Sequence, residues 1–281
     1  MTADRPSLTG HSPSLMPPPQ PPATTRIWET FTDFVEHLGQ LGQMTWGAVR
    51  ATFRRPLELS STIYQMEALG TRSLGIASVT ALFVGMVMAV QFGFGLQKFG
   101  GMEYTGRVIG ISFSRELAPT LTAIVVGGRI GAGIAAEVGS MAVTEQIDAI
   151  RALGADPLKK LVLPRLAACL IVMPVLGAFA LVLGFLGAML VCSAQFGIPS
   201  GFFLATALES VTFGDFFSGM LKTPVFGAII ALVGCHFGLI TRGGTEGVGH
   251  ATTRAVVATS IAILISDFFL TKLFILIFPQ K

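Results

Sequence analysis

One stretch decides the fold of this chain: RVIGISFSRELAPTLTAIVVGGRIGAGIAAEVGSMAVTEQIDAIRALGADPLKKLVLPR, from Arg107 to Arg165. It begins as an apolar segment that Arg115 and Glu116 interrupt, and it continues through the glycine-rich run GGRIGAGIAAE before it ends in a polar segment. The part before that polar segment is long enough to cross a bilayer. Charged groups within a membrane are costly and usually face a bundle interior or a water-filled cavity. We therefore predict a membrane helix with inward-facing charges, followed by a polar loop.

The composition of the whole chain indicates an integral membrane protein. Of its 281 residues, 52% are hydrophobic and only 12% are charged, whereas soluble domains carry about 25% charged residues. The basic residues form no stripe with aromatic residues, so we expect no nucleic-acid partner. The three cysteines lie in apolar runs and lack the spacing of a disulfide framework or a metal site. The expected fold class is an all-α integral membrane protein without a metal.

The lengths of the apolar runs predict five membrane-spanning helices. A further apolar stretch before the fourth span is broken by glycine, proline and acidic residues, which favours an outer helical segment over a span. The polar segment after the second span is expected to be a cytoplasmic helix. The predicted elements are the spans 73–97, 107–137, 166–192, 216–240 and 255–278, the polar helix 144–164 and the outer segment 196–215.

The first 72 residues differ in composition from the rest. Residues 1–25 are rich in proline, serine and threonine and are predicted to be a disordered tail. Residues 26–72 are predicted to hold an amphipathic helix and a connector. Trp28 and Trp46 favour a helix that lies in the membrane interface, with aromatic rings at the level of the head groups. A soluble helix that docks on a partner is the alternative.

The distribution of basic residues predicts the orientation. Most of them flank the N-terminal region, the central polar segment and the last loop, and fewer flank the opposite ends of the spans. The positive-inside rule places the more basic side in the cytoplasm. With five spans, the N-terminus is then cytoplasmic and the C-terminus lies outside.

Arg115, Glu116 and Pro119 form the first candidate site. Adjacent helix residues do not face each other, so Arg115 and Glu116 are expected to reach different partners. Pro119 lacks an N–H group and leaves the carbonyl of Arg115 without its helical partner. The sequence predicts a polar defect within the membrane. It is either a structural ion pair to another helix or the lining of a cavity for an amphiphile's head group.

Small residues in the glycine-rich run predict close helix packing. Gly127 and Gly131 stand four residues apart, as do Ala132 and Ala136, and this spacing lets helix backbones approach. The run superficially matches a dinucleotide fingerprint, but no β-α-β context surrounds it.

Two further charged residues belong to predicted spans. Asp267 is a lone acid near the middle of the last span, and Lys222 lies near the outer end of the fourth. An intramembrane carboxylate is a candidate functional group. A hydrogen-bonded structural role for Asp267 is the alternative.

The sequence contains no motif for hydrolysis. It lacks the phosphate loop GxxxxGK[ST], HExxH, GxSxG and any cysteine–histidine cluster. If the chain moves a substrate uphill, the energy comes from a partner or from an ion gradient.

The run that begins RELAPTL at Arg115 and ends at Arg165 resembles the MlaE family of ABC-transporter permeases. HATTRAVVATS (250–260) and SDFFLT (266–271) fit the same family, and the resemblance extends from about Arg50 to the C-terminus. It implies a homodimer with five spans and an interfacial helix in each protomer. Arg115, Glu116 and Pro119 would lie near a lipid cavity between the protomers.

The resemblance also implies partners. They are a cytoplasmic ABC ATPase that binds ATP and Mg, an MCE-domain lipid-binding protein on the outer side and, in many cases, a STAS-domain subunit. The segment around Glu145 would be the coupling helix that docks on the ATPase. Its candidate coupling residues are Glu145, Gln146, Asp148, Arg151 and Asp156.

From this resemblance we expect a permease of the bacterial inner membrane, not an enzyme, with no cofactor of its own. It would move phospholipids between that membrane and the MCE carrier and so maintain the lipid asymmetry of the outer membrane. An ion-coupled secondary carrier for an amphiphile, with Glu116 and Asp267 as proton sites, is the main alternative. A non-transporting scaffold, whose charges only hold helices together, is the other.

Overall fold

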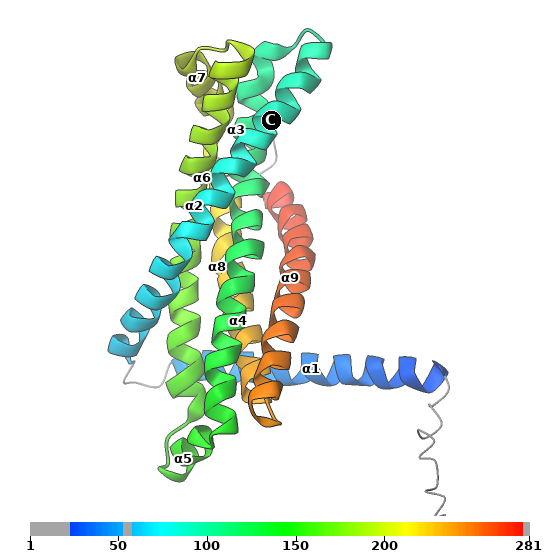
Figure 1. The fold of residues 1–281 in the computed structure, drawn as a ribbon, viewed down its shortest axis with the longest axis vertical. Coiled ribbons are helices and arrows are strands. Elements are labelled where there is room, and N and C mark those ends of the chain that lie inside the picture. The colour runs from blue at the N-terminus through cyan, green and yellow to red at the C-terminus, as the bar shows by residue number, and fades with distance from the viewer. Residues whose placement is uncertain (1–22, 53–57, 278–281) are drawn as a thin grey trace, which may run out of the picture. The chain divides into compact units, whose positions relative to one another are not determined.

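The computed structural model describes residues 23–52 and 58–277, and in this part of the chain every regular element is helical. Five helical stretches in it are long and apolar enough to cross a membrane. The predicted all-α membrane fold is confirmed. The elements are α1 (Ala23–Thr52), α2 (Leu59–Lys98), η1 (Met102–Tyr104), α3 (Thr105–Ser112), η2 (Phe113–Leu121), α4 (Thr122–Val143), α5 (Gln146–Ala152), η3 (Leu158–Val162), α6 (Leu163–Phe196), α7 (Ser200–Ser210), α8 (Phe213–Leu239) and α9 (Gly244–Ile277) (Figure 1).

The chain divides into two compact units, with the boundary after Gly39 inside α1. In the first unit the described part is helical from Ala23, so the last residues of the predicted tail belong to α1; residues 1–22 lie outside the described part. The side chain of Trp28 lies outside it as well, whereas Trp46 is described and is 72% exposed. In the second unit, Met44 and Ala48 of α1 are buried in the main hydrophobic core.

Several helices extend beyond the spans that the apolar runs predict. The connector is helical from Leu59 and continuous with the first span, and α9 begins at Gly244, within the predicted polar loop. At 40 residues, α2 is about 60 Å long, twice the thickness of the hydrocarbon core. It must tilt or project beyond that core. Hydropathy marks the apolar section of a helix, whereas its ends are set by backbone hydrogen bonds that continue into polar sequence.

The predicted polar helix 144–164 is divided in the structure. α5 ends at Ala152, a turn with Gly154 at φ +74° follows, and η3 continues directly into α6. Asp156 accepts a hydrogen bond from the backbone N–H of Leu158 (2.9 Å), which stabilises the first turn of the returning helix. Figure 1 shows α5 at one end of the bundle and α7 at the other.

α4 lies at the centre of the second unit, where it packs against α8, α9 and α2. A side chain at Gly127 would meet Ile230 of α8, and one at Gly131 would come within 3.2 Å of the Thr259 hydroxyl of α9. The small residues of the glycine-rich run therefore lie where helices of the same chain cross. Ala132 and Ala136, in the same run, are half-buried.

The second span is not a regular α-helix throughout. Residues 113–121 form a π-helix, η2, which contains Pro119. Proline disrupts the hydrogen bond to the residue four positions back, and a π-helical segment accommodates that disruption. This irregular segment carries Arg115 and Glu116, and it positions the candidate site.

Candidate functional site

Lys222 of α8 is the centre of a charged network inside the bundle. Its side chain is 1% exposed, and its Nζ lies 2.6 Å from Glu116 Oε2 and 3.0 Å from Asp267 Oδ1. The ammonium also contacts the Thr271 hydroxyl (2.7 Å) and donates to the backbone carbonyl of Arg115 (3.3 Å). A buried cation is tolerated only when it is paired and hydrogen-bonded, and this one has both kinds of partner.

The carbonyl of Arg115 is available because of Pro119. In a regular helix the residue at position 119 would donate its N–H to that carbonyl, but proline has no such donor. The Lys222 ammonium donates to this carbonyl. This confirms the local polar defect that the sequence predicts, and it identifies a lysine from another span as the group that satisfies it.

A glycine allows the two helices to come this close. Gly219 lies one turn before Lys222 on α8, and a Cβ at this position would clash with the backbone carbonyl of Ser114 in η2. With any larger residue the helices would separate, and Lys222 would reach Glu116 less well.

Arg115 points to a different partner. Its guanidinium lies 3.5 Å from the carboxylate of Asp215, at the start of α8. Asp215 also forms a capping box with Thr212, since its carboxylate accepts from the Thr212 backbone N–H (3.0 Å) and its own N–H donates to the Thr212 hydroxyl (3.2 Å). The prediction that Arg115 and Glu116 reach different partners is confirmed.

The remaining contacts connect the network to α9. Thr120 of η2 donates a hydrogen bond to Asp267 Oδ1 (3.1 Å), and the Thr271 hydroxyl lies 2.8 Å from the Asp267 carbonyl. Asp267 is therefore both an intramembrane acid and a hydrogen-bonded group, so the two alternatives for it are not exclusive. The network joins η2, α8 and α9, three segments that are far apart in the sequence.

The network holds more acid than base. Two cations, Arg115 and Lys222, face three carboxylates, those of Glu116, Asp215 and Asp267. Lys222 is shared by two of those acids, and Glu116 is the more exposed of the two, with 36% of its side chain accessible against 18% for Asp267. A surplus carboxylate at the accessible edge is able to receive a cation or a proton.

The sequence identified part of this network and missed the rest. Lys222 was expected near the outer end of its span, yet it is the buried centre. Asp215 and Thr271 were not singled out, although the spacing of Thr212 and Asp215 is a capping-box signal that the sequence displays. Several of the pairings join residues more than a hundred positions apart, and even Lys222 and Thr271 are 49 positions apart, so local spacing cannot reveal them.

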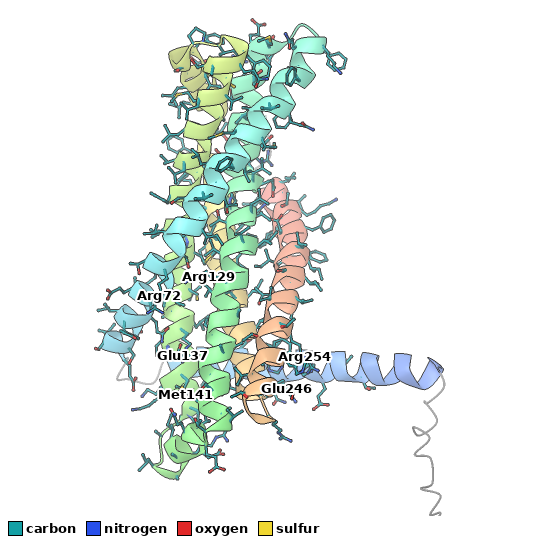
Figure 2. The ribbon with its side chains drawn as sticks, in the orientation of Figure 1. Arg72, Arg129, Glu137, Met141, Glu246 and Arg254 are labelled. Carbon is teal, nitrogen blue, oxygen red and sulfur yellow. The ribbon has the colours of Figure 1, made fainter. Side chains whose placement is uncertain are left out.

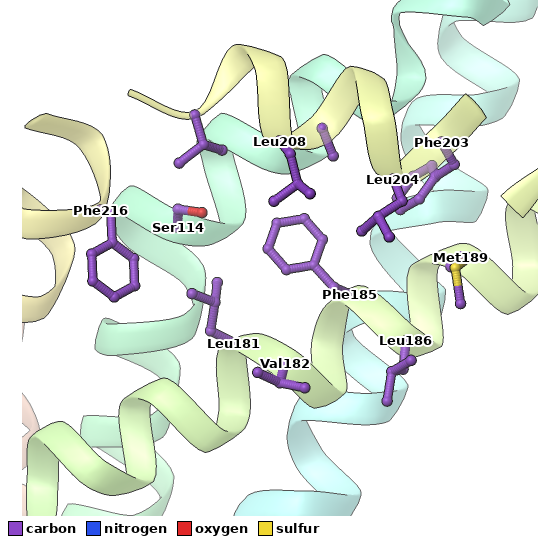
Figure 3. A pocket seen from close by; sticks show the side chains of 12 residues that line it. Ser114, Leu181, Val182, Phe185, Leu186, Met189, Phe203, Leu204, Leu208 and Phe216 are labelled. Carbon is purple, nitrogen blue, oxygen red and sulfur yellow. The ribbon is translucent and has the colours of Figure 1, made fainter. Parts of the chain in front are cut away.

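An apolar pocket of about 360 Å³ is lined in part by Ser114 and Phe216, the chain neighbours of Arg115 and Asp215. Figure 3 shows Phe185 and Leu181 of α6 facing Leu204 and Leu208 of α7 across it. Its only polar lining residue in the described part is Ser114, the neighbour of Arg115, and Phe216, the neighbour of Asp215, lies on the same wall. The charged pair is thus one residue along the chain from the wall of a space that suits hydrocarbon.

α5 is exposed but firmly anchored. Ile147 is 4% exposed and belongs to the main core, whereas Glu145, Gln146 and Asp148 point to solvent. Arg151 is exposed too and pairs with Asp148 at 2.8 Å. Glu145 has φ +59°, the only positive φ of a non-glycine residue in the described part. This arrangement presents a polar surface on a helix whose movement would be transmitted to the bundle.

Within the described residues no group of three or more histidine, cysteine, aspartate or glutamate side chains has the arrangement of a metal site. The candidate site therefore consists of the Lys222 network, the pair Arg115–Asp215 and the adjoining apolar pocket. The five membrane-crossing helices and the ionic network between them define the class of protein. It is a multi-pass membrane protein with an internal polar site.

Comparison with known proteins identifies the family. The sequence profile of "Permease MlaE" matches residues 62–273, so the chain belongs to the MlaE permease family. A probable ABC transporter permease of Synechocystis sp. is 43% identical over 213 residues, which cover 76% of this chain and 81% of that protein. A probable ABC transporter permease of Rickettsia conorii is 39% identical over 241 residues, which cover 86% and 93%.

A plant chloroplast protein is also similar. The Arabidopsis thaliana protein named trigalactosyldiacylglycerol 1 is 40% identical over 214 residues, which cover 76% of this chain and 61% of that protein. Membership of this family makes the chain a transport permease, as the sequence resemblance implies.

Proposed function

We propose that this chain is the permease subunit of an ABC transporter that moves phospholipids between the bacterial inner membrane and an MCE-domain carrier outside it. The observation that carries the proposal is the charged pair Arg115–Asp215, whose chain neighbours Ser114 and Phe216 line an apolar pocket between membrane-spanning helices. A phospholipid has the same two-part character, a charged head group and hydrocarbon tails.

Arg115 is suited to a lipid phosphate. A guanidinium presents several N–H donors in a fork that can form two hydrogen bonds to one phosphate. Its contact with Asp215 is loose, at 3.5 Å, and its side chain is 18% exposed. A phosphate that enters therefore competes for the guanidinium with a carboxylate 3.5 Å away. Because Lys222 pairs with Glu116, Glu116 does not become a second acidic partner of Arg115.

Energy would come from a separate ATPase that binds ATP and Mg. Glu145, Gln146, Asp148, Arg151 and Asp156 are the proposed coupling residues, and the exposed surface of α5 together with the burial of Ile147 supports this role. Movement of α5 would change the position of α4, which carries the second span. The family membership and the ABC-transporter names of the relatives support an ATPase partner.

The wider assembly follows from the family resemblance. It comprises a second copy of this chain, with a lipid cavity between the copies, an MCE-domain protein at the outer face and a STAS-domain subunit. The N-terminus is cytoplasmic and the C-terminus periplasmic, and the role is to maintain the lipid asymmetry of the outer membrane. The name of the chloroplast relative, which is that of a glycolipid, supports a lipid substrate.

The test is transport by the complex reconstituted with its ATPase and MCE protein. Glu145→Lys should abolish ATP-dependent transfer of a fluorescent phospholipid while the membrane fold stays intact. Glu67→Lys, the same charge change at another exposed acid of the described structure, is the matched control and should transfer lipid normally. If Glu145→Lys moves lipid and hydrolyses ATP at the normal rates, the coupling assignment is wrong.

One observation favours the second candidate, a proton-coupled carrier. Glu116 and Asp267 share a single ammonium, so the network has one more carboxylate than it has cations. A proton on either acid would balance the charge. Lipid uptake into vesicles that contain only this chain, driven by a proton gradient and abolished in Asp267→Asn, would establish this mechanism in place of the ABC mechanism.

A further inference from the structure

A second cavity, which is polar, lies at the end of the bundle that carries α5. Its volume is about 450 Å³, and it lies between the start of α2, the last turns of α4 and the junction of η3 with α6. Figure 2 shows Glu137 and Met141 on the part of α4 that approaches α5. The lining residues that matter below are Ser61, Tyr64, Glu137, Met141, Lys160 and Arg165.

Arg165 is buried at the edge of this cavity, and its guanidinium has more N–H donors than acceptors. The residue is 4% exposed. One nitrogen of its guanidinium donates to the Leu161 carbonyl (2.8 Å), and another lies 2.9 Å from Glu137 Oε1. Its Nε is buried and has no hydrogen-bond partner among the residues that the structure describes. A guanidinium has five N–H donors, and leaving such a donor unpaired in a protein interior is costly.

Lys160 adds a second positive charge to the cavity wall. Its side chain is half-exposed, and its nearest acid, Glu58, is 3.8 Å away at the limit of an ion pair. The lining thus contains two cations and one carboxylate, that of Glu137, which is itself half-exposed. The Tyr64 hydroxyl adds an uncharged donor, whereas the Ser61 hydroxyl already donates to Glu58 (3.2 Å). Because the Arg165 Nε has no partner among the described residues and Lys160 is only loosely paired, the cavity has a surplus of hydrogen-bond donors.

The cavity lies where the apolar runs of two helices meet charged sequence. Arg165 is the last charged residue before the uncharged run of α6, and Glu137 is the first acid after the apolar run of α4. Met141 and Leu161 add apolar surface to the wall. A group that binds here meets cations and donors on one side and apolar side chains on the other, as a lipid head group does at the membrane surface.

We propose that this cavity binds the phosphate of a glycerophospholipid head group, with Lys160 and Arg165 as the cationic ligands. A phosphate diester matches the surplus donors, and the guanidinium fork of Arg165 suits two of its oxygens. Because the cavity is formed by the segments on both sides of α5 together with α2, a bound lipid would tie these three segments together. Inorganic phosphate has the same binding chemistry, and the experiments separate the two sources.

The first experiment is chemical footprinting of the purified full-length chain in detergent. Lys160 and Lys159 are neighbours, but of the two only Lys160 lines the cavity, so each molecule carries its own control. Acetylation of Lys160, read by peptide mass spectrometry, should slow about fivefold with phosphatidylglycerol, as one partly exposed charge-assisted contact predicts. Lys159 should be unaffected, and diacylglycerol, which lacks the phosphate, should protect neither lysine.

The same footprinting experiment is repeated with inorganic phosphate in place of the lipid. Protection by phosphatidylglycerol but not by inorganic phosphate supports a lipid site, and equal protection by both supports a site for phosphate in general. If Lys160 reacts as fast with phosphatidylglycerol as without it, or if diacylglycerol protects it equally, the proposal fails.

The second experiment uses two variants with opposite expected effects. Lys160→Gln should weaken phosphatidylglycerol binding about fivefold in native mass spectrometry, whereas Lys159→Gln should leave it unchanged. Glu137→Gln removes the carboxylate that competes for Arg165, and it should tighten binding about threefold. If the Glu137–Arg165 pair only holds the structure together, Glu137→Gln should weaken phosphatidylglycerol binding. That result would overturn the assignment of Arg165 as a phosphate ligand.

Discussion

Lys222 and Arg165 are two buried cations whose surroundings differ in one respect, the balance of donors and acceptors. The Lys222 ammonium has three protons and four acceptor groups within reach: Glu116, Asp267, Thr271 and the carbonyl of Arg115. The Arg165 guanidinium has five N–H donors and, in the described structure, two oxygen partners. A surplus of acceptors fixes a cation and the helices around it, whereas a surplus of donors leaves capacity for an anion.

The largest effect is expected at Lys222. Lys222→Met leaves two carboxylates, of which Asp267 is the less exposed, without their shared cation. Removing one partner of a buried ion pair costs about 3–5 kcal/mol. Unfolding of the purified protein in mixed micelles, titrated with sodium dodecyl sulfate, should show a loss of that size.

The matched control neutralises the acids as well. Lys222→Met combined with Glu116→Gln and Asp267→Asn should recover most of the lost free energy of unfolding, because no uncompensated charge remains. If the single variant unfolds at the wild-type midpoint, Lys222 does not hold the network together and the contrast with Arg165 disappears.

The second effect tests how closely η2 and α8 must approach. A methyl group at Gly219 meets the Ser114 carbonyl, so Gly219→Ala should force the helices apart and cost about 2–3 kcal/mol. Gly133→Ala on α4 is the control, because no described atom lies within 4 Å of its Cβ position, and it should be neutral or slightly stabilising. The same titration measures both, and equal midpoints would contradict the close approach.

A smaller loss is expected at Arg165, although it is buried almost as deeply as Lys222. Arg165→Met leaves only Glu137 unpaired, and that carboxylate is 53% exposed, so water replaces the missing partner. We expect a loss of about 1–2 kcal/mol, mostly from the hydrogen bond to the Leu161 carbonyl. A loss as large as that of Lys222→Met would show that the number of donors and acceptors does not distinguish the two sites.

The comparison also explains what the sequence could predict. Five apolar runs, the polar defect at Pro119 and the divergence of Arg115 from Glu116 follow from local spacing and hydropathy. The centre of the network does not, because Lys222 meets its acids only after three distant segments pack together. The sequence places Lys222 near the outer end of the fourth predicted span but does not show which acids it meets. The cavity at Arg165 could not be predicted from the sequence for the same reason, because three separate elements form it.

The smallest effect concerns the segment between α4 and η3, which neither cation stabilises. Glu145 has φ +59°, a conformation that costs an L-residue about 1–2 kcal/mol and costs glycine almost nothing. Glu145→Gly should therefore raise the free energy of unfolding by about 0.5–1 kcal/mol, after the greater freedom of glycine in the unfolded chain is subtracted. Ala149→Gly, at an exposed position within α5, should instead lose about 1 kcal/mol. Opposite signs for two glycine substitutions four residues apart would show that strain is stored at the start of α5. A loss in both would mean that Glu145 is relaxed, and that the exposed end of the bundle carries no strain that a partner could release.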